Sequence, residues 1–232
     1  MPTDNNSEWC NDSSLYFQKK DASRVFTLHK KIVEDISISN AMEILDYGSG
    51  DGKILESFPS INRYKFTLHD PDESAMNEAI KKFNGYENVR FEADSNNLPS
   101  NFYDAVIFCN VIMCVKSTDN LQETIQTIKR IKRKTGAVYA GLTHPCFLDK
   151  QFATYSNDFS LGEKSFDYFD NGAIYHVYMQ EQDNTIVIKD FFWNLSLIIN
   201  LFLMSGFNLL SIKELRDVEK NNFSPFMILK FN

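Results

Sequence analysis

The ten residues EILDYGSGDG, from Glu43 to Gly52, decide the fold of this chain. An apolar stretch leads into three glycines at alternate positions, Gly48, Gly50 and Gly52. Such glycines let the backbone come close to a ligand, because no Cβ stands in between. A helix that follows the turn presents its free N–H groups to the same ligand. The stretch therefore predicts a short buried strand, a ligand-binding turn and a helix that begins at 53–58 and stops before Pro59.

Strands and helices alternate on the carboxyl side of this turn. The expected strands cover 64–69, 88–92, 103–109 and 137–142, and the expected helices cover 72–83 and 118–132. Another helical pattern, at 15–38, precedes the turn. Strands that alternate with helices are typical of βαβ units and a parallel sheet. We therefore expect an α/β fold with a doubly wound sheet.

The alternation ends after Thr143. Two stretches with period-two patterning, 173–180 and 185–192, predict a β-hairpin, and two final strands are expected within 207–215 and 225–231. Strands that follow one another without a crossover helix usually pair antiparallel. The sequence thus predicts a mostly parallel seven-stranded sheet with an antiparallel last strand and an inserted hairpin.

We expect a single domain over 1–232 with four parts. A helical cap covers 1–40, a ligand-binding core 41–144, a lid and hairpin insertion 145–192, and a helix with the last strands 193–232. The apolar run 191–207 contains Asn and Ser residues and is short for a membrane span, so we expect a buried helix and no membrane contact. The polar, acidic N-terminus resembles no targeting signal, which favours the cytoplasm.

Composition excludes some partners and favours others. The formal net charge is −7, and the one dense basic stretch, Lys129–Lys134, ends a helical pattern where cations are favourable. Nucleic acid is therefore not an expected partner. The four cysteines form no C-x-x-C pair, so we expect free, mostly buried thiols and no metal. Twenty phenylalanines provide material for an apolar pocket. The oligomeric state is not predicted.

Three ligand classes use a glycine turn of this kind. A phosphate-binding P-loop would need Ser or Thr after Lys53, where the chain has Ile54. A dinucleotide fingerprint would need its third glycine at position 53, which is lysine. The pattern D-x-G-x-G-x-G from Asp46 instead resembles the cofactor loop of class I S-adenosylmethionine-dependent methyltransferases. A carboxylate suits this cofactor, because its ammonium and sulfonium groups are positive.

Further segments resemble the same family, and with it a Rossmann-like fold. The resemblance implies that Asp70, followed by Pro71, binds the ribose hydroxyls, and that Asp94 and the Ser95 N–H contact the adenine. It also implies that Asn110 lines the site and that an N-terminal helix covers the cofactor. The cofactor residues expected from the resemblance are Tyr16, Asp46, Gly48, Ser49, Gly50, Asp70, Pro71, Asp94, Ser95 and Asn110.

The stretch His144-Pro-Cys-Phe147 is similar to the exit of the fifth strand in a small-molecule subgroup of these methyltransferases. Ser205-Gly206-Phe207 and the terminal strand also fit this subgroup, whereas Phe192-Trp193-Asn194 departs from its usual His-Arg-Pro-like element. The resemblance implies methyl transfer from S-adenosylmethionine to an oxygen or nitrogen of a small metabolite. The product would be S-adenosylhomocysteine, and no metal is required.

Residues that would act on the acceptor are predicted from position and type. His144 leaves the fifth strand at the expected active edge, so it is our candidate general base; it could equally be a loop histidine bonded to backbone. Aromatic residues crowd 147–178 and form either a substrate lid or a separate aromatic core. The candidate substrate residues are Phe147, Tyr168, His176 and Trp193. Two other functions stay open, a non-catalytic binding protein of this fold and a nicotinamide-dependent oxidoreductase.

Overall fold

Five parallel strands, followed on one side by two further strands, form the main sheet. The computed structural model describes residues 16, 25–150, 152, 155–159, 165–181, 184–216 and 222–232. Within these residues the main sheet has seven strands in the order β3-β2-β1-β4-β5-β10-β9. Their bounds are β1 Glu43–Tyr47, β2 Lys65–His69, β3 Val89–Glu92, β4 Tyr103–Cys109, β5 Lys132–Thr143, β9 Leu209–Leu215 and β10 Phe226–Phe231.

The last strand, β10, runs antiparallel to both of its neighbours, β5 and β9. The strands β1 to β5 pair in parallel. The expected mostly parallel sheet with an antiparallel last strand is therefore confirmed. Its consequence for the site is that the carboxyl ends of β1, β2, β4 and β5 share one edge, where an open α/β sheet usually binds its ligand.

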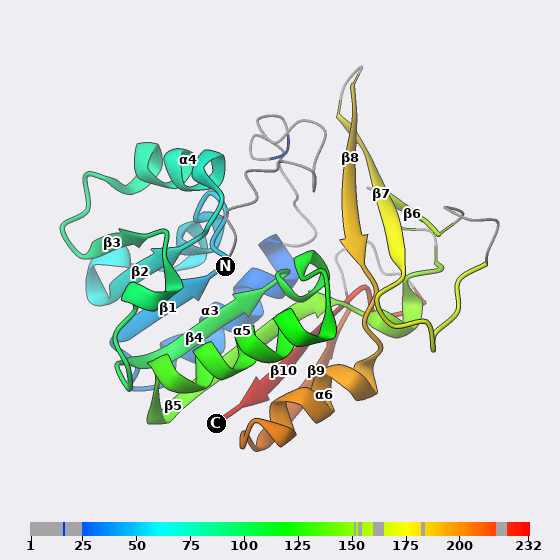
Figure 1. The fold of residues 1–232 in the computed structure, drawn as a ribbon. Helices are drawn as coiled ribbons and strands as arrows, with labels where there is room; N and C mark the ends of the chain where they lie inside the picture. Colours follow the sequence, from blue (N-terminus) through cyan, green and yellow to red (C-terminus); the bar gives the residue numbers. More distant parts are fainter. Residues whose placement is uncertain are drawn as a thin grey trace.

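Helices cover both faces of this sheet (Figure 1). On one face, α5 (Thr118–Ile131) and α6 (Leu195–Met204) pack their apolar sides against alternate residues of β1, β4, β5 and β10. On the other face lie α3 (Lys30–Ser37) and α4 (Glu73–Phe83). Because both faces are covered, the central strands are apolar at nearly every position, for example EILDY and YDAVIFC.

A second sheet of three antiparallel strands stands beside the active edge of the main sheet (Figure 1). It contains β6 (Tyr155–Asp158), β7 (Ile174–Glu181) and β8 (Asn184–Phe191). The hairpin β7–β8 was expected from its period-two pattern. The short strand β6 was not, because its four residues show no such period.

Two predicted elements differ from the structure. The helix expected from 53 to 58 is a 3₁₀-helix, Lys53–Ser57; it ends before Pro59 as predicted, because Pro59 holds the preceding Phe58 in an extended conformation. Strand β5 begins five residues earlier than the predicted start at Ala137. Of the predicted N-terminal helix, the structure describes Tyr16, a π-helical turn at Val25–His29, and α3; residues 1–15 and 17–24 of the expected cap lie outside the described residues.

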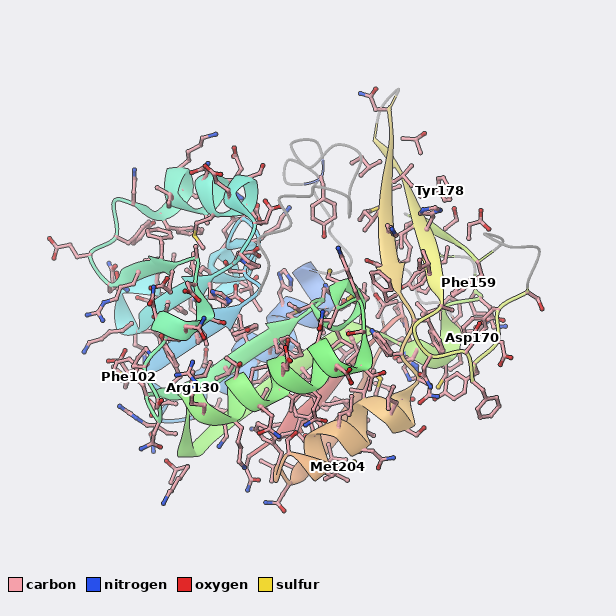
Figure 2. All side chains as sticks on the ribbon, in the orientation of Figure 1. Phe102, Arg130, Phe159, Asp170, Tyr178 and Met204 are labelled. Carbon is pink, nitrogen blue, oxygen red and sulfur yellow. The ribbon has the colours of Figure 1, made fainter. Side chains whose placement is uncertain are left out.

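The apolar run 191–207 contains α6, which is buried on one side only. Ile198 and Phe202 are fully buried, whereas Met204 is 80% exposed and lies on the outer surface of α6 (Figure 2). The expectation of a buried helix is therefore half right. No helix in the described ranges is long and apolar enough to cross a membrane.

Candidate functional site

The glycine turn joins β1 to the end of β2. The backbone N–H groups of Gly48 and Ser49 both donate to the carbonyl of His69, at 2.7 and 2.9 Å. Gly48, Gly50 and Gly52 have positive φ angles of 77°, 55° and 72°. A Cβ added at Gly48 would lie 2.4 Å from a methyl group of Val111, so Val111 packs where a side chain would otherwise be. The turn therefore requires glycine here both for its conformation and for its space.

A cavity of about 850 Å³ opens above this turn. It lies at the carboxyl ends of β1, β2 and β4, and its size is within the usual range for cofactor sites. Eight of the ten predicted cofactor residues line it, namely Tyr16, Asp46, Gly48, Ser49, Gly50, Asp70, Pro71 and Asn110. The fold thus brings together predicted residues that are up to 94 positions apart in the sequence (16 to 110).

Asp70 is fixed at the end of β2 by the backbone around it. Its two carboxylate oxygens accept hydrogen bonds from the N–H groups of Gly50, at 2.8 Å, and Asp72, at 2.9 Å. A carboxylate has about four lone-pair sites, so roughly two stay available for a ligand. Burial raises the pKa of Asp70 to about 6, although the two N–H donors counteract this rise. Asp70 is therefore a preorganised acceptor for a pair of hydroxyl donors.

Asp46 lies deeper, at the end of β1, and is 3% exposed. Burial is the main cause that raises its pKa to about 8, and the charges of Asp70 and Asp51 contribute in the same direction. The ligand-free protein thus holds Asp46 largely protonated at neutral pH. A cationic group bound in the cavity would stabilise the carboxylate and compensate for the cost of its burial.

This pKa leads to a prediction about stability. The unfolded Asp46 ionises near its ordinary pKa of 3.8, so between about pH 4 and about pH 8 the folded protein binds more protons than the unfolded chain. Its contribution to stability is therefore full at low pH and is lost as the pH rises through this window. We expect the Asp46→Asn variant to lose less stability than the wild type between these two pH values. Urea unfolding at both ends checks this, and equal losses in the two proteins would contradict it.

Asp94 and Ser95 are placed differently from the other predicted cofactor residues. Asp94 is exposed, and its side chain accepts hydrogen bonds from the backbone and side-chain nitrogens of Asn96, both at 2.9 Å. The Ser95 carbonyl accepts from Arg130, at 2.9 Å. Both residues follow β3, the strand next to β2, but neither belongs to the described lining of the cavity.

Asn110 ends β4 with a positive φ of 56°, which is uncommon for a residue with a side chain. Its N–H donates to the carbonyl of Gly141, at 2.7 Å, which fixes this conformation. Its side-chain Oδ1 is buried and has no hydrogen-bond partner among the described residues. A buried, unsatisfied acceptor at the wall of a cavity favours a ligand that donates a hydrogen bond there.

His144 does not reach the cavity. It is 2% exposed, its Nδ1 accepts from the N–H of Cys146 at 3.2 Å, and its Nε2 lies 2.9 Å from a carboxylate oxygen of Glu214. Both ring nitrogens are thus bonded, and His144 caps the 3₁₀ turn Pro145–Phe147. The geometry favours the second reading of this residue, a loop histidine that orders the backbone.

The four candidate substrate residues also lie outside the described cavity linings. Phe147 packs against His144 and Phe223. The Tyr168 hydroxyl accepts from the N–H of Leu195, at 3.1 Å, and the Trp193 indole donates to the carbonyl of Val115, at 3.2 Å. These three side chains thus have structural contacts.

His176 is the fourth of these residues. On β7 it alternates with Tyr175 and Val177, which face a small cavity, so its own side chain lies on the opposite face of the strand. The other aromatic residues of 147–178 fall into two groups. Phe159 and Phe166 pack in an aromatic core on the second sheet, which was one of the two expectations for this segment, whereas Tyr155 and Tyr175 line the small cavity.

Sequence reasoning missed that small cavity and its carboxylate, Asp190. The cavity has a volume of about 90 Å³ and lies between the second sheet and the active edge of the main sheet. Asp190 occupies an inward position of β8, in line with Ile186 and Ile188. A charged residue at an inward position of a period-two strand is a signal that the sequence did contain.

The structure provides no evidence of a metal site. Within the described ranges, no group of three or more His, Cys, Asp or Glu side chains is placed to hold an ion. Cys109, Cys114 and Cys146 are free thiols, as expected. The expectation that the thiols are mostly buried is wrong for Cys114 and Cys146, which are exposed.

Comparison with known proteins relates this chain to methyltransferases. Residues 44–136 match the family model that describes a methyltransferase domain. This part of the chain is therefore similar to a methyltransferase domain, and the described residues have the fold of solved class I S-adenosylmethionine-dependent methyltransferases.

Among curated proteins, the chain is similar to the non-reducing polyketide synthase mapC from Penicillium roqueforti (strain FM164), with 28% identity over 118 residues. This match covers 45% of the chain and 5% of the synthase, so the chain spans a small part of that relative's length. Among solved structures, a S-adenosylmethionine-dependent methyltransferase from Clostridium acetobutylicum ATCC 824 is 14% identical, with a TM-score of 0.64 and 95% of each chain covered.

A second solved structure carries ligands. It is the Burkholderia thailandensis 1,6-didemethyltoxoflavin-N1-methyltransferase with bound 1,6-didemethyltoxoflavin and S-adenosylhomocysteine. It is 12% identical to this chain, with a TM-score of 0.58, and the match covers 93% of this chain and 80% of that one. At these identities the likeness concerns the fold.

Proposed function

We propose that this protein transfers the methyl group of S-adenosylmethionine to a nitrogen or oxygen atom of a small molecule. Residues 1–232 would act as one unit, with 145–192 as the lid over the acceptor. The observation that carries the proposal is the cavity of about 850 Å³, which is lined by eight of the ten residues that the family resemblance assigns to the cofactor.

The residues of this cavity fit S-adenosylmethionine. The turn at Gly48 and Gly50 presents backbone without side chains, Asp70 has free lone pairs for the ribose hydroxyls, and Asp46 is a counter-ion for a cationic group. When bound, the cofactor supplies a methyl group on a positively charged sulfur. A small-molecule acceptor is also supported by the Burkholderia thailandensis structure, in which a small substrate occupies a protein of this fold.

The chain would contribute position and environment to the reaction. Methyl transfer is an in-line displacement, so holding the acceptor in line with the sulfur and excluding water supply much of the acceleration. Asn110 and Cys114 line both the large and the small cavity, so the acceptor atom would meet the methyl group beside them. The Asp46 carboxyl would lose its proton when the cofactor's ammonium binds, because the cation stabilises the carboxylate.

Isothermal titration tests the proposal directly. We expect S-adenosylmethionine and S-adenosylhomocysteine to bind with dissociation constants of about 1–100 μM, and NADH not to bind. Titrations in phosphate and in Tris buffer at neutral pH should differ in heat, because Asp46 releases a proton on binding. A folded protein that binds neither S-adenosyl compound would overturn the proposal, and binding of NADH alone would favour an oxidoreductase. Formation of S-adenosylhomocysteine with a panel of acceptors would separate an enzyme from a non-catalytic binding protein.

A further inference from the structure

The small cavity adjoins the large one. Tyr16, Asn110 and Cys114 line both. The Cys114 residue is exposed to solvent at the cavity wall, but protein atoms surround its sulfur; this desolvation is the main cause that raises the pKa of the thiol, and the charges of Asp190 and Asp70 contribute in the same direction. Because Asp70 belongs to the large cavity and Asp190 to the small one, Cys114 lies between them. The small cavity is therefore placed where a methyl acceptor would approach the cofactor.

Asp190 is a buried carboxylate that has no cationic partner among the described residues. It is 8% exposed, and no Lys, Arg or His in the described part of the chain forms an ion pair with it. Its cross-strand neighbour on β7, Tyr175, provides one hydrogen bond from its hydroxyl. Burial raises the pKa of Asp190 to about 7, and the tyrosine hydrogen bond opposes this rise. Burying an unpaired carboxyl is costly, so its presence requires a reason beyond folding.

Two amide oxygens at this cavity are acceptors that lack a donor among the described residues. The Oδ1 atoms of Asn110 and Asn157 are buried and have no hydrogen-bond partner among the described residues. The Nδ2 of Asn157 donates to the carbonyl of Leu148, at 2.9 Å, which fixes the orientation of this amide. One carboxyl group and two amide oxygens thus line the same small space.

The rest of the lining is mostly apolar or aromatic. It comprises Met113, Leu148, Val177, Met179, Ile188 and Phe226, the three tyrosines Tyr16, Tyr155 and Tyr175, and two polar residues, Thr143 and Cys114. A ligand that satisfies this surface must bring several N–H donors and a positive charge on a small apolar body. An ammonium group meets this description. A carboxylate would be repelled by Asp190, and an alcohol has only one donor for several acceptors.

We propose that the small cavity binds the amino group of the methyl acceptor, with Asp190 as its counter-ion and as the base that removes its proton. This inference rests on the proposed function and makes it specific to a small aliphatic amine. The proton of the bound ammonium passes to the Asp190 carboxylate, which leaves a neutral amine. The nitrogen lone pair then forms the new N–CH₃ bond as the S–CH₃ bond breaks, and its electron pair stays on sulfur as the neutral thioether. The proton on Asp190 leaves to water with the product.

Three probes of one shape test the charge preference, namely n-butylamine, 1-butanol and butanoate. Saturation-transfer NMR would measure their binding to the protein saturated with S-adenosylhomocysteine. We expect n-butylamine to bind at least about tenfold more tightly than 1-butanol, and butanoate not to bind. Binding of 1-butanol as tight as that of n-butylamine, or no binding of n-butylamine at all, would overturn the inference.

Two matched variants test the role of Asp190. Asp190→Asn keeps the size of the side chain and removes its charge, so we expect n-butylamine affinity to fall by about tenfold or more. Asp158→Asn changes an aspartate of the same sheet that pairs in register with His176 and is not part of the described lining, so affinity should be unchanged. Equal amine affinity in wild type and Asp190→Asn would also overturn the inference.

The two hypotheses can fail separately. S-adenosylhomocysteine titration of each variant shows whether the cofactor site is intact. If no variant and not even the wild type binds S-adenosylhomocysteine, the proposed function fails, and the amine preference measured without it still decides the inference. If Asp190→Asn does not fold, the comparison of the three probes on the wild type decides by itself.

Discussion

Replacing Asp70 with asparagine should weaken S-adenosylhomocysteine binding by about 100-fold, because hydrogen bonds to a charged acceptor are worth about 1.5–3 kcal/mol and two ribose hydroxyls are expected here. The carboxylate oxygens already accept from the N–H groups of Gly50 and Asp72. The amide NH₂ of asparagine would face backbone N–H groups and ribose hydroxyls that are themselves donors, so at least one of these hydrogen bonds would be lost. Isothermal titration of wild type and variant measures the effect.

Asp104→Asn is the matched control. Asp104 also accepts two backbone N–H groups, from Met42 and Glu43, both at 3.0 Å, and it contacts Arg133. It lies at the amino end of β4, outside the described lining of the large cavity. We expect this variant to lose stability while its S-adenosylhomocysteine affinity stays within about twofold of the wild type. Equal affinity in wild type and Asp70→Asn would refute the ribose role.

The second large effect is expected for Gly48→Ala. A side chain at a positive φ costs about 1–2 kcal/mol, and overpacking against Val111 costs about 1–3 kcal/mol more. We therefore expect the free energy of unfolding to fall by about 2–5 kcal/mol. Cofactor affinity should fall as well, because the turn that approaches the ligand must move. Urea unfolding and isothermal titration measure the two quantities.

Gly85→Ala is the control for this substitution. Gly85 follows α4, its φ is not positive, and no atom lies within 4 Å of an added Cβ. Alanine there should change stability by less than about 1 kcal/mol and leave affinity unchanged. The double variant Gly48→Ala/Val111→Ala should recover the steric part of the loss and keep the part due to φ. Full stability of the single Gly48→Ala variant would rule out the argument.

Much of the cofactor site could be predicted because its signals are local. Three glycines at alternate positions after an apolar strand allow few backbone paths, and the structure has positive φ at all three. Asp70 follows β2 directly, and β2 pairs in parallel with β1, so their carboxyl ends meet. The aspartate at 94 was predicted by the same reasoning, but its side chain is bound to Asn96 and does not reach the described lining.

The residues expected to meet an acceptor lie outside the described cavity linings, because the placement of such side chains depends on which face of a strand meets which neighbour. His144 was predicted as a general base from its position at the end of a strand. In the structure its Nε2 instead contacts the carboxylate of Glu214, which is seventy residues away in sequence. His176 lies one position from Tyr175, and in a strand that single step turns a side chain to the opposite face. Asp190 was visible as a charge inside an alternating pattern, but its meaning depends on the surface that β8 packs against.

The sequence alone determined the parallel sheet, the glycine turn and the carboxylates at its edge, because strand periodicity and glycine conformation are properties of short segments. Only the tertiary structure decided the pocket proposed for the acceptor. It brings Asp190 and Tyr175 of the β7–β8 hairpin beside Asn110 and Cys114 of the loop that follows β4, and these two segments are far apart in the chain. The physical reason is that a buried charge has a meaning only through what surrounds it, and those surroundings are set by packing between segments that are distant in the chain.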